Sequence, residues 1–576
     1  MNKVLKAFII TNLVMLALFG VGAFFVYKNY NAAQKERELL AKQELDKQVY
    51  GLSKEDVSED TIIPLSIKGT KKNVETFQVK DIYDAASSKR VKDELEAIKK
   101  KNKLKYEVDA ALFAYNPFGT HALSLYFYFN TMQVSTLRYT IHVEDEDIPD
   151  FTRTPKMTGG LGTREMEGVI AGLVPGVKNY IILKLYDDKD KLVKRVVYSF
   201  TPPKLGGVAQ TKLMEVDGSS LNEVSNGLYL FLGHDAENKK MTPGIYLYDN
   251  SGVLRGLLPT VSQRTTRVIY INNQMFYNYS NTGFAMVSSI GQVMKTYKIK
   301  GYQLANDYVY DGYGNIIGIA TKSGAKTVED QIISLNLESG RTTHLVDLTK
   351  LLKKVKKKSK DQKNWIELNG IVWATKDSVV VSAKKLSGLI KLKNISSVTP
   401  TIEYIIGDTT LWKKQGKTKG LLTKYVDTTT TSSTTAATTA ATTAAQTTDP
   451  FESQYLQSGL QLSSVEDKYP INDGQYYLIL FDNHKKGSDT SYYYKYYVDE
   501  TTGTYDLVKN MKVPYSASDS SVQEYHGNLV VNSADQTTVG EYDADGVLIQ
   551  QLKYPIETDT FRVWKMDFKD FWFLET

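Results

Sequence analysis

The sequence predicts a mainly β protein: a six-bladed β-propeller preceded by a small β-sandwich domain, with an N-terminal transmembrane helix and a helical stalk. Three observations lead to this prediction. Six strand–turn–strand units recur after residue 205, alternating segments fill residues 103–203, and an apolar stretch occupies residues 7–27. With 576 residues and 42% hydrophobic content, the chain is long enough to bury two or three cores.

The apolar stretch at residues 7–27 has the length of a bilayer-spanning helix and contains only Thr11 and Asn12 as polar residues. A cleaved signal peptide is the alternative, supported by the small residues at 20–23. However, the apolar run continues through Phe24, Phe25 and Val26, which a signal peptidase site would not normally do. We therefore expect an uncleaved anchor in residues 1–30. Lysines on both sides leave its orientation open.

Residues 31–104 are expected to form a helical stalk or linker. A polar helix is predicted at residues 32–48 and an amphipathic helix at 79–101, and solvated helices without a partner are the alternative. In residues 105–203 apolar and polar residues alternate as they do in β-strands, which predicts a small β-sandwich that ends at Pro202 and Pro203. The expected strands are 123–129, 137–143, 169–173, 179–186 and 194–200.

Residues 204–576 contain a repeated unit of strand, turn and strand, which predicts the propeller. The spacing is about 40 to 60 residues, with one gap of about 100. Blades of this length that close radially leave few exposed sheet edges. A Thr/Ala-rich loop at 427–449 lies in the long gap and is too polar and too small in its side chains to form a core. The six hairpins begin at residues 244, 283, 331, 388, 493 and 539.

Composition excludes several functions. The 71 basic and 65 acidic residues give a formal net charge of +6, which is too small to indicate nucleic acid binding. No cysteine is present, so disulfides and thiol chemistry are excluded, and the six scattered histidines do not suggest a metal centre. We expect no cofactor. Eight lysines in residues 350–363 predict a solvated loop, with an anion-attracting rim as the alternative.

Residues 365–392 combine two short strands with charged residues at the strand ends. Glu367 comes before the first strand, which contains Asn369, and Lys384 follows the second strand, 378–382. Charged groups at strand ends of a propeller blade are candidates for a site at the axis.

Several strings stand in the order found in the arylsulfate sulfotransferase family, and this chain resembles that family from residue 105 to its end. The resemblance implies a six-bladed propeller behind an N-terminal β domain. It also implies sulfuryl transfer from a phenolic sulfate ester to a phenol, through a sulfurylated histidine, in the periplasm or outside the cell. The strings are EGVIAGLVPG at 167–176, VED at 328–330, SLNLESGR at 334–341, the run 382–392, LFDN at 480–483, VPYS at 513–516, VGEYDADG at 539–546 and FRV at 561–563.

The resemblance places the family's three catalytic histidines and its arginine at positions that hold other residues here. The aligned strings are Ala305-Asn306-Asp307, Trp365–Asn369, Ser382-Ala383-Lys384 and Gln454-Tyr455. The replacements are Asn306, Glu367, Lys384 and Tyr455. This makes it uncertain from sequence whether the chain is an aryl-sulfate sulfotransferase or a pseudoenzyme.

Two hypotheses follow. In the first, Tyr455 accepts the sulfuryl group, Glu367 is the base, and Lys384, Asn306 and Asn369 stabilise the oxyanion, with Asn369 and Lys384 also binding substrate. In the second, the propeller is catalytically inactive and binds a ligand or surface partner. An ionised Glu367 about 4 Å from a sulfate costs about 4 kcal/mol at an effective dielectric of 20. Pairing with Lys384 would remove that cost and leave a self-neutralised, structural centre.

The expected location follows from the anchor and the resemblance together. We expect a membrane-anchored protein with the bulk of the chain extracytoplasmic, at the cell surface. The expected partners are the membrane, through the N-terminal helix, and a small aryl sulfate or other anionic ligand at the propeller axis. A homo-oligomer through the stalk or N-terminal domain is a further possibility, and no nucleic acid is expected.

Overall fold

The computed structural model describes residues 62–68, 73–160, 163–207, 209–234, 242–417, 419–425, 453–483, 489–555 and 560–574. Apart from Ile62, all described residues belong to one compact unit, Ile63–Thr576. The predicted anchor, the polar helix at 32–48 and the Thr/Ala-rich loop lie outside the described residues. Within the described ranges, no helix is both long and apolar enough to cross a bilayer.

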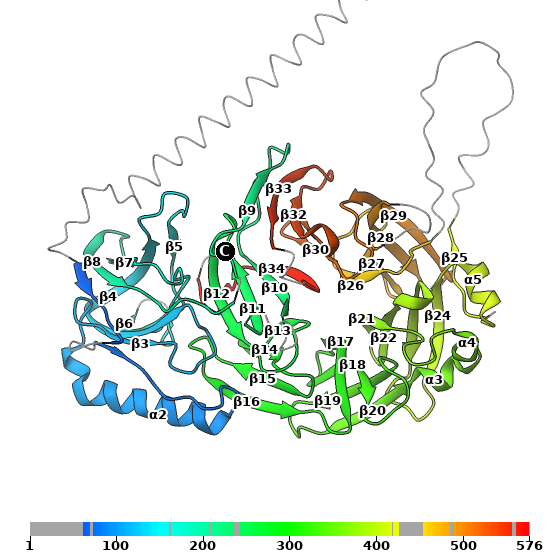
Figure 1. Cartoon of the computed structure of the whole chain (residues 1–576), viewed down its shortest axis with the longest axis horizontal. Helices are drawn as coiled ribbons and strands as arrows, with labels where there is room; N and C mark the ends of the chain where they lie inside the picture. Colours follow the sequence, from blue (N-terminus) through cyan, green and yellow to red (C-terminus); the bar gives the residue numbers. More distant parts are fainter. Residues whose placement is uncertain are drawn as a thin grey trace, which may run out of the picture. The chain divides into compact units, whose positions relative to one another are not determined.

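Six sheets follow one another around a common centre, so the chain has the six-bladed propeller arrangement predicted from its repeats (Figure 1). The first three sheets are β10 (Leu228–His234), β11 (Gly244–Tyr248) and β12 (Leu254–Pro259) with β34 (Arg562–Met566); β13 (Val268–Ile271), β14 (Gln274–Asn278), β15 (Gly283–Val287) and β16 (Val293–Lys298); and β17 (Tyr302–Tyr310), β18 (Asn315–Lys322), β19 (Gln331–Asn336) and β20 (Thr342–Asp347).

The last three sheets are β21 (Leu368–Thr375), β22 (Ser378–Ala383), β23 (Gly388–Lys393) and β24 (Thr401–Gly407); β25 (Thr423–Lys424), β26 (Ser458–Ser463), β27 (Gln475–Asp482), β28 (Ser491–Asp499) and β29 (Thr504–Val513); and β30 (Ser521–Tyr525), β31 (Asn528–Ser533), β32 (Thr538–Tyr542) and β33 (Leu548–Lys553) with β9 (Met214–Asp217). We call these sheets blades 1 to 6 in this order.

The six predicted hairpins are confirmed. Each one forms the two strands of a blade that lie farther from the axis. They are β11–β12, β15–β16, β19–β20, β23–β24, β28–β29 and β32–β33. The strands nearest the axis are therefore those that the repeat did not include, and they carry the candidate site.

Both ends of the propeller sequence close the ring. The last strand, β34, pairs with β10 in blade 1, while β9 pairs with β33 at the outer edge of blade 6. The first and last blades are thus each completed by a strand from the other end of the propeller sequence.

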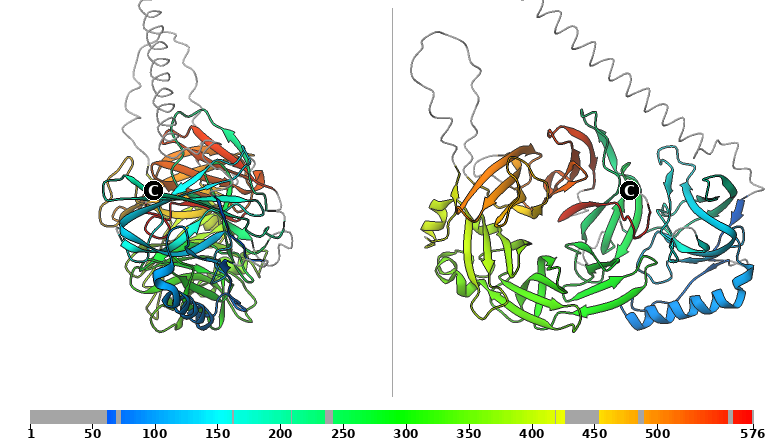
Figure 2. Two further views of the ribbon diagram at one scale, coloured as in Figure 1. Left: turned by 90° about the vertical axis from the view of Figure 1, so that its left-hand side faces the viewer. Right: turned by 180° about the vertical axis from the view of Figure 1, so that it is seen from behind.

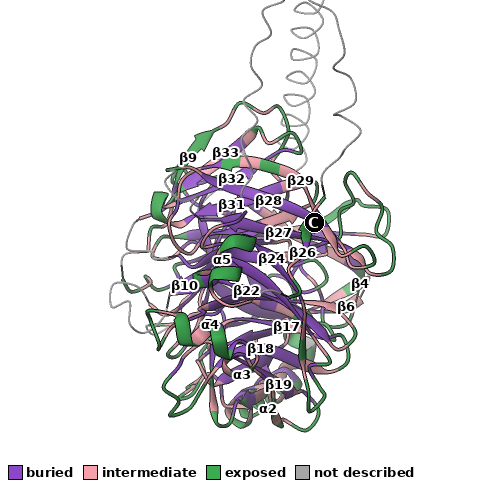
Figure 3. Ribbon diagram, turned by 90° about the vertical axis from the view of Figure 1, so that its right-hand side faces the viewer, coloured by how far each residue is buried: buried purple, intermediate pink, exposed green. Residues whose placement is uncertain are grey.

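Buried lysine–glutamate pairs join consecutive blades. Lys565 and Glu541 link blades 1 and 6 at 2.6 Å, and both side chains are 0% exposed. Lys495 of blade 5 binds Glu524 of blade 6 at 3.0 Å. In the same way, Lys391 of blade 4 reaches Glu500 at the turn of blade 5. The buried strands between these pairs form the core of the propeller (Figure 3).

An eight-stranded sheet precedes the propeller, and the 19-residue strand β4 (Ser124–His142) organises it. The first half of β4 pairs with β3 and β6, and its second half pairs with β5 and β7. The predicted strands at 123–129 and 137–143 are therefore one strand, because the residues between them remain extended. The others are β1 (Ile62–Pro64), β2 (Val74–Glu75), β3 (Leu112–Tyr115), β5 (Phe151–Arg153), β6 (Thr163–Ala171), β7 (Asn179–Tyr186) and β8 (Leu192–Phe200).

Helix α2 (Ala85–Asn102) lies in the region expected to form the stalk (Figure 2). It packs against β16 of blade 2, and its Lys92 and Lys99 form ion pairs with Glu167 on β6 of the N-terminal sheet. It begins later than predicted because Asp84 caps it, accepting hydrogen bonds from the backbone N–H groups of Ala86 and Ser87. The backbone N–H of Val293 on β16 donates to Ser88 of the helix at 2.8 Å. In the same region, β1 and β2 join the N-terminal sheet.

The lysine-rich segment forms two short helices where the sequence suggested a loop. They are α3 (Leu348–Leu351) and α4 (Lys353–Lys358), and Asp347 caps the first of them. Val355 is 2% exposed while most of the lysines around it face solvent. Burial of this valine holds the second helix against the protein. In the described ranges, the other helices are α5 (Thr409–Lys414) and the short 3₁₀ turns Lys103–Lys105, Lys384–Leu386 and Ala534–Gln536.

Candidate functional site

The predicted site residues lie in blades 3, 4 and 5, on or next to strands close to the axis. Asn306 is on β17 and Asn369 is the second residue of β21. Glu367 directly precedes β21, and Lys384 directly follows β22. Tyr455 precedes β26, the inner strand of blade 5. Four of these five are connected through side-chain or backbone contacts around Glu367, and we call these residues and their contacts the axial cluster.

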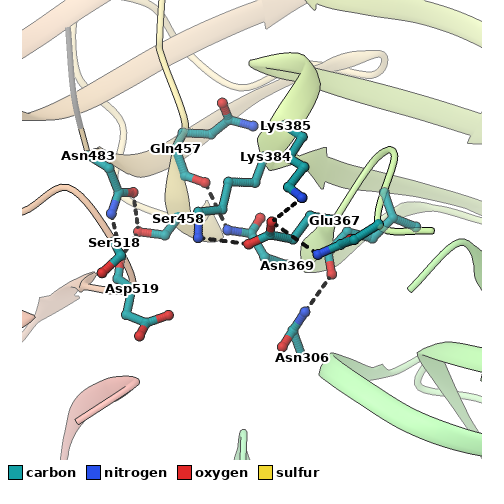
Figure 4. A network of polar contacts seen from close by, with 12 residues as sticks. Asn306, Glu367, Asn369, Lys384, Lys385, Gln457, Ser458, Asn483, Ser518 and Asp519 are labelled. Carbon is teal, nitrogen blue, oxygen red and sulfur yellow. Dashed lines mark hydrogen bonds and ion pairs between the residues drawn. The ribbon is translucent and has the colours of Figure 1, made fainter. Parts of the chain in front are cut away.

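Glu367 and Lys384 form an ion pair at the centre of the axial cluster (Figure 4). The Lys384 Nζ lies 2.8 Å from Glu367 Oε1, and the side chains are 15% and 20% exposed, respectively. The backbone N–H of Lys384 also donates to the Glu367 carbonyl at 3.1 Å. Lys385 Nζ lies 3.8 Å from the other carboxylate oxygen. The carboxylate of Glu367 is therefore neutralised within the protein.

Two loops hold Glu367 in place through a buried tryptophan. The Nε1 of Trp365 donates to Asp330 Oδ2 at 3.0 Å, and both side chains are buried. The backbone N–H of Leu368 donates to the Glu329 carbonyl at 3.3 Å. Glu367 and Glu329 both have positive φ, +49° and +55°, which non-glycine residues adopt at a cost. The loops therefore bring two strained glutamates side by side.

Asn306 and Asn369 each donate a hydrogen bond from the side-chain amide to a backbone carbonyl group. Asn306 Nδ2 donates to the Leu368 carbonyl at 2.9 Å, and Arg264 Nη2 donates to Asn306 Oδ1 at 3.4 Å. Asn369 Nδ2 donates to the Gln457 carbonyl at 2.8 Å. One N–H of each amide predicted to hold an oxyanion is thus already engaged.

Glu329 is a member of the axial cluster that the sequence did not identify as a site residue. Burial raises the pKa of its carboxyl, and the nearby Glu367 carboxylate raises it further, against the hydrogen bond from Asn306 and the charges of Arg264 and Lys384. The string VED at 328–330 was the available signal, but it supported the family resemblance and did not indicate a role for the glutamate.

Tyr455 is placed by its backbone, whose N–H donates to Asp482 Oδ1 at 2.6 Å, and its side chain is half-buried. Its neighbours in the motif are structural. The amide of Gln454 donates to the Ile406 carbonyl at 2.9 Å, and Gln457 Nε2 donates to Ser382 Oγ at 2.9 Å. The framework residues of the aligned motifs therefore tie blades 4 and 5 together.

Next to Asn306, Asp307 forms a fully buried hub that joins blades. It binds Arg267 through two hydrogen bonds of 3.0 Å and Arg562 of β34 at 3.0 Å. It also accepts the backbone N–H of Ile371 on β21 at 3.2 Å. Burial alone would raise the pKa of Asp307, but the two arginines hold it below its ordinary value. This aspartate is an anchor for the axial end of the ring.

Neither a metal site nor a histidine belongs to the axial cluster in the part of the chain that the structure describes. No group of three or more His, Cys, Asp or Glu side chains is placed to hold a metal there. The four histidines whose side chains are described contact residues elsewhere: His121 stacks on Trp572, and His142, His344 and His526 lie beside Asp150, Gln331 and Asp567.

The fold and the axial cluster define a class: six-bladed β-propellers with an N-terminal β domain and a charged polar cluster near the axis. Residues 214–561 match the family model described as Arylsulfotransferase (ASST), and residues 112–201 match the Arylsulfotransferase Ig-like domain. Since the first match covers more than half of the chain, the chain belongs to the arylsulfotransferase family. The family assignment predicted from the sequence motifs is thereby confirmed. No curated protein matches the sequence.

Solved structures with a similar course of the chain include a periplasmic gluconolactonase from Pseudomonas aeruginosa, with 10% identity over 74% of this chain and 99% of that chain, at a TM-score of 0.32. An auxiliary nutrient binding protein from Bacteroides ovatus has 9% identity, 74% and 94% coverage, and a TM-score of 0.30. A virginiamycin B lyase from Staphylococcus aureus has 9% identity, 73% and 100% coverage, and a TM-score of 0.28. Likenesses this distant carry no argument about function.

Proposed function

We propose that this chain is an arylsulfotransferase-family protein that has lost histidine-dependent sulfuryl transfer and uses its axial end to bind a ligand. The observation that carries the proposal is the 2.8 Å ion pair between Glu367 and Lys384. These two residues stand where the resemblance expects a catalytic histidine and the arginine that grips the sulfate.

The electrostatics of the pair support this proposal. A sulfuryl group needs cations or N–H donors around its non-bridging oxygens. Lys384 is a single point charge without the two-pronged geometry of arginine, and it is already bound to a carboxylate. Separating the pair to admit a sulfate would expose that sulfate to Glu367, at about 4 kcal/mol for a 4 Å approach and an effective dielectric of 20.

The test is incubation of the full chain with 4-nitrophenyl sulfate and excess phenol, with Tyr455→Phe as the matched control. We expect no release of nitrophenol above the control. Release that Tyr455→Phe abolishes would overturn the proposal. It would favour the catalytic alternative instead, in which Tyr455 accepts the sulfuryl group with Glu367 as base and Lys384, Asn306 and Asn369 as oxyanion donors.

A gain-of-function experiment tests whether the propeller can still support sulfuryl transfer once the missing catalytic residues are restored. Histidine is placed at 306, 367 and 455 and arginine at 384, which restores the set that the family resemblance implies. If the scaffold lacks only its chemical groups, the fourfold variant releases nitrophenol while wild type does not. A folded but inactive variant would count against an ancestral sulfotransferase geometry at these positions.

The location and the N-terminal domain belong to the same proposal. We propose that residues 1–30 anchor the chain in a membrane, that the bulk of the chain is extracytoplasmic, and that residues 105–203 form the small β-sandwich. The Ig-like match supports the sandwich, as do the different strand partners of the two halves of β4. Resistance to alkaline extraction and cleavage by protease added to intact cells are the expected results. Release into the soluble fraction would refute the anchor.

A further inference from the structure

A cavity of about 380 Å³ lies between blades 5 and 6, away from the axial cluster. Gln457, which contacts the axial cluster, directly precedes β26, whereas Ser464 directly follows β26 and lines the cavity. The strand between them has six residues and spans about 20 Å. Ser464, Asp467 and Ala544 of the lining are exposed, so a ligand in solution can reach the cavity. Its volume is that of a small-molecule site, which is typically about 300–1,000 Å³.

Four side chains of blade 5 form one wall of the cavity. Tyr493 is paired with Met511 and Lys495 with Lys509 on β28 and β29, so these side chains share one face of the strand pair. The Tyr493 hydroxyl and Lys495 Nζ both donate to Glu524 Oε1 of blade 6, each at 3.0 Å. Contacts within the protein therefore hold this wall in place.

Both lysines of the wall are already bound to oxygen atoms of the protein. Lys495 is 2% exposed and, besides Glu524, donates to the Val465 carbonyl at 2.8 Å. Lys509 donates to the Ala544 carbonyl across the boundary between the blades. An anion that entered the cavity would have to compete with these oxygen atoms for each lysine.

Asp467 provides the accessible charge of the cavity. It is exposed, and its carboxylate forms no ion pair with the residues that the structure describes. Burial raises the pKa of the Tyr493 hydroxyl, and the carboxylates of Glu524 and Asp467 raise it further, so Asp467 lies near the blade 5 wall. With Asp543, three carboxylates and two lysines line the cavity, and His526 adds a positive charge only when protonated.

Apolar and aromatic side chains complete the lining. They are Val465, Met511, Tyr525 and Leu529. Leu529 is 7% exposed, and Met511 and Tyr525 are half-buried, so they form a surface on which an apolar group loses contact with water. Thioether and aromatic groups also make favourable contacts with aromatic rings, and the face of a tyrosine ring attracts cations.

We propose that this cavity binds an organic ammonium ion with an apolar body about the size of one aromatic ring. Its ammonium group pairs with Asp467, and its body packs against Met511, Tyr525 and Leu529. The site is separate from the axial cluster, so the inference does not depend on the loss of sulfuryl transfer. It also differs in charge from the aryl sulfate or other anionic ligand expected at the axis.

The experiment is isothermal titration calorimetry on the full chain in detergent, after subtraction of the heat that each probe gives in detergent alone. The probes carry a phenyl ring on a two-carbon chain and differ in charge: 2-phenylethylamine is a cation, 2-phenylethanol is neutral and 3-phenylpropionate is an anion. We expect saturable binding of 2-phenylethylamine. The alcohol and the carboxylate should bind at least tenfold more weakly.

Asp467→Asn removes the charge at nearly constant shape and is expected to weaken the binding of 2-phenylethylamine at least tenfold. Asp545→Asn is the matched control, because Asp545 is exposed and lies in the β32–β33 turn beside the cavity but does not line it. It should change the affinity by less than about twofold. Ser464→Lys adds a cation at an exposed position of the lining and should also weaken binding at least tenfold. Circular dichroism checks that the variants fold.

Three results would overturn the inference: no saturable binding of 2-phenylethylamine, equal or tighter binding of the alcohol or the carboxylate, or unchanged affinity in the folded Asp467→Asn and Ser464→Lys variants. Binding that survives Asp467→Asn and is abolished by Glu367→Gln would place the amine at the axial cluster and would overturn it equally.

Discussion

Breaking the Glu367–Lys384 pair is expected to destabilise the propeller far more than breaking an exposed pair of the same length. The two charges lie 2.8 Å apart, which corresponds to a gross attraction of about 6 kcal/mol at an effective dielectric of 20. Because both side chains are largely buried, desolvation offsets much of this attraction. We expect a net coupling of about 1.5–3 kcal/mol.

The measurement is a double-mutant cycle with Glu367→Gln, Lys384→Met and the double variant, followed by urea unfolding of the full chain. Tryptophan fluorescence is the readout, since the buried Trp365 lies two residues from Glu367. Glu367→Gln leaves Lys384 without its carboxylate, and Lys384→Met leaves Glu367 with only the more distant Lys385, 3.8 Å away, so each should lose more stability than the double variant.

The control is the pair Lys89–Asp93 on α2, which is 2.7 Å long but has side chains 72% and 61% exposed. Exposed pairs of this spacing couple by about 0.3–0.5 kcal/mol. If the Glu367–Lys384 cycle gives no more than this control, the pair is not a self-neutralised structural centre. The argument against sulfate binding would then fail as well.

Three further predictions concern stability. Lys565→Met is expected to cost about 3–5 kcal/mol in urea unfolding, because it leaves Glu541 buried and unpaired, and adding Glu541→Gln should restore part of the loss; a cost below about 1 kcal/mol would contradict the burial argument. His121 is buried without a ring hydrogen bond, and burial lowers its pKa to about 3. Below about pH 6.5 the unfolded chain therefore binds a proton at this residue that the folded chain does not bind. The free energy of unfolding consequently falls as the pH drops from 6.5 toward 3. Relative to His121→Phe, wild type should lose about 1.4 kcal/mol between pH 7.5 and 5.5, and a pH-independent difference would refute this. Asp84→Ala should lower the thermal midpoint while Asp84→Asn preserves it, since Asn is an equally good cap; equal loss in both would assign the effect to something other than capping.

The axial cluster was only partly predictable. Glu367 and Lys384 were identified because they flank strands in one short segment, and their pairing was one of two outcomes that the sequence left open. Glu329 was missed because it belongs to the preceding blade and meets the Glu367 segment only in the folded chain, through the Leu368 N–H and the contact between Trp365 and Asp330. The role of Tyr455 stays a prediction, since its position is defined here by its backbone.

The sequence by itself determined the repeated hairpins and hence the number of blades, because period-two alternation and turn residues are local signals. It also determined the family, through the order of its motifs, and which catalytic residue types are missing. Tertiary structure alone decided that the charged replacements Glu367 and Lys384 neutralise each other. Pairing depends on distances between blades, and local sequence patterns do not contain those distances.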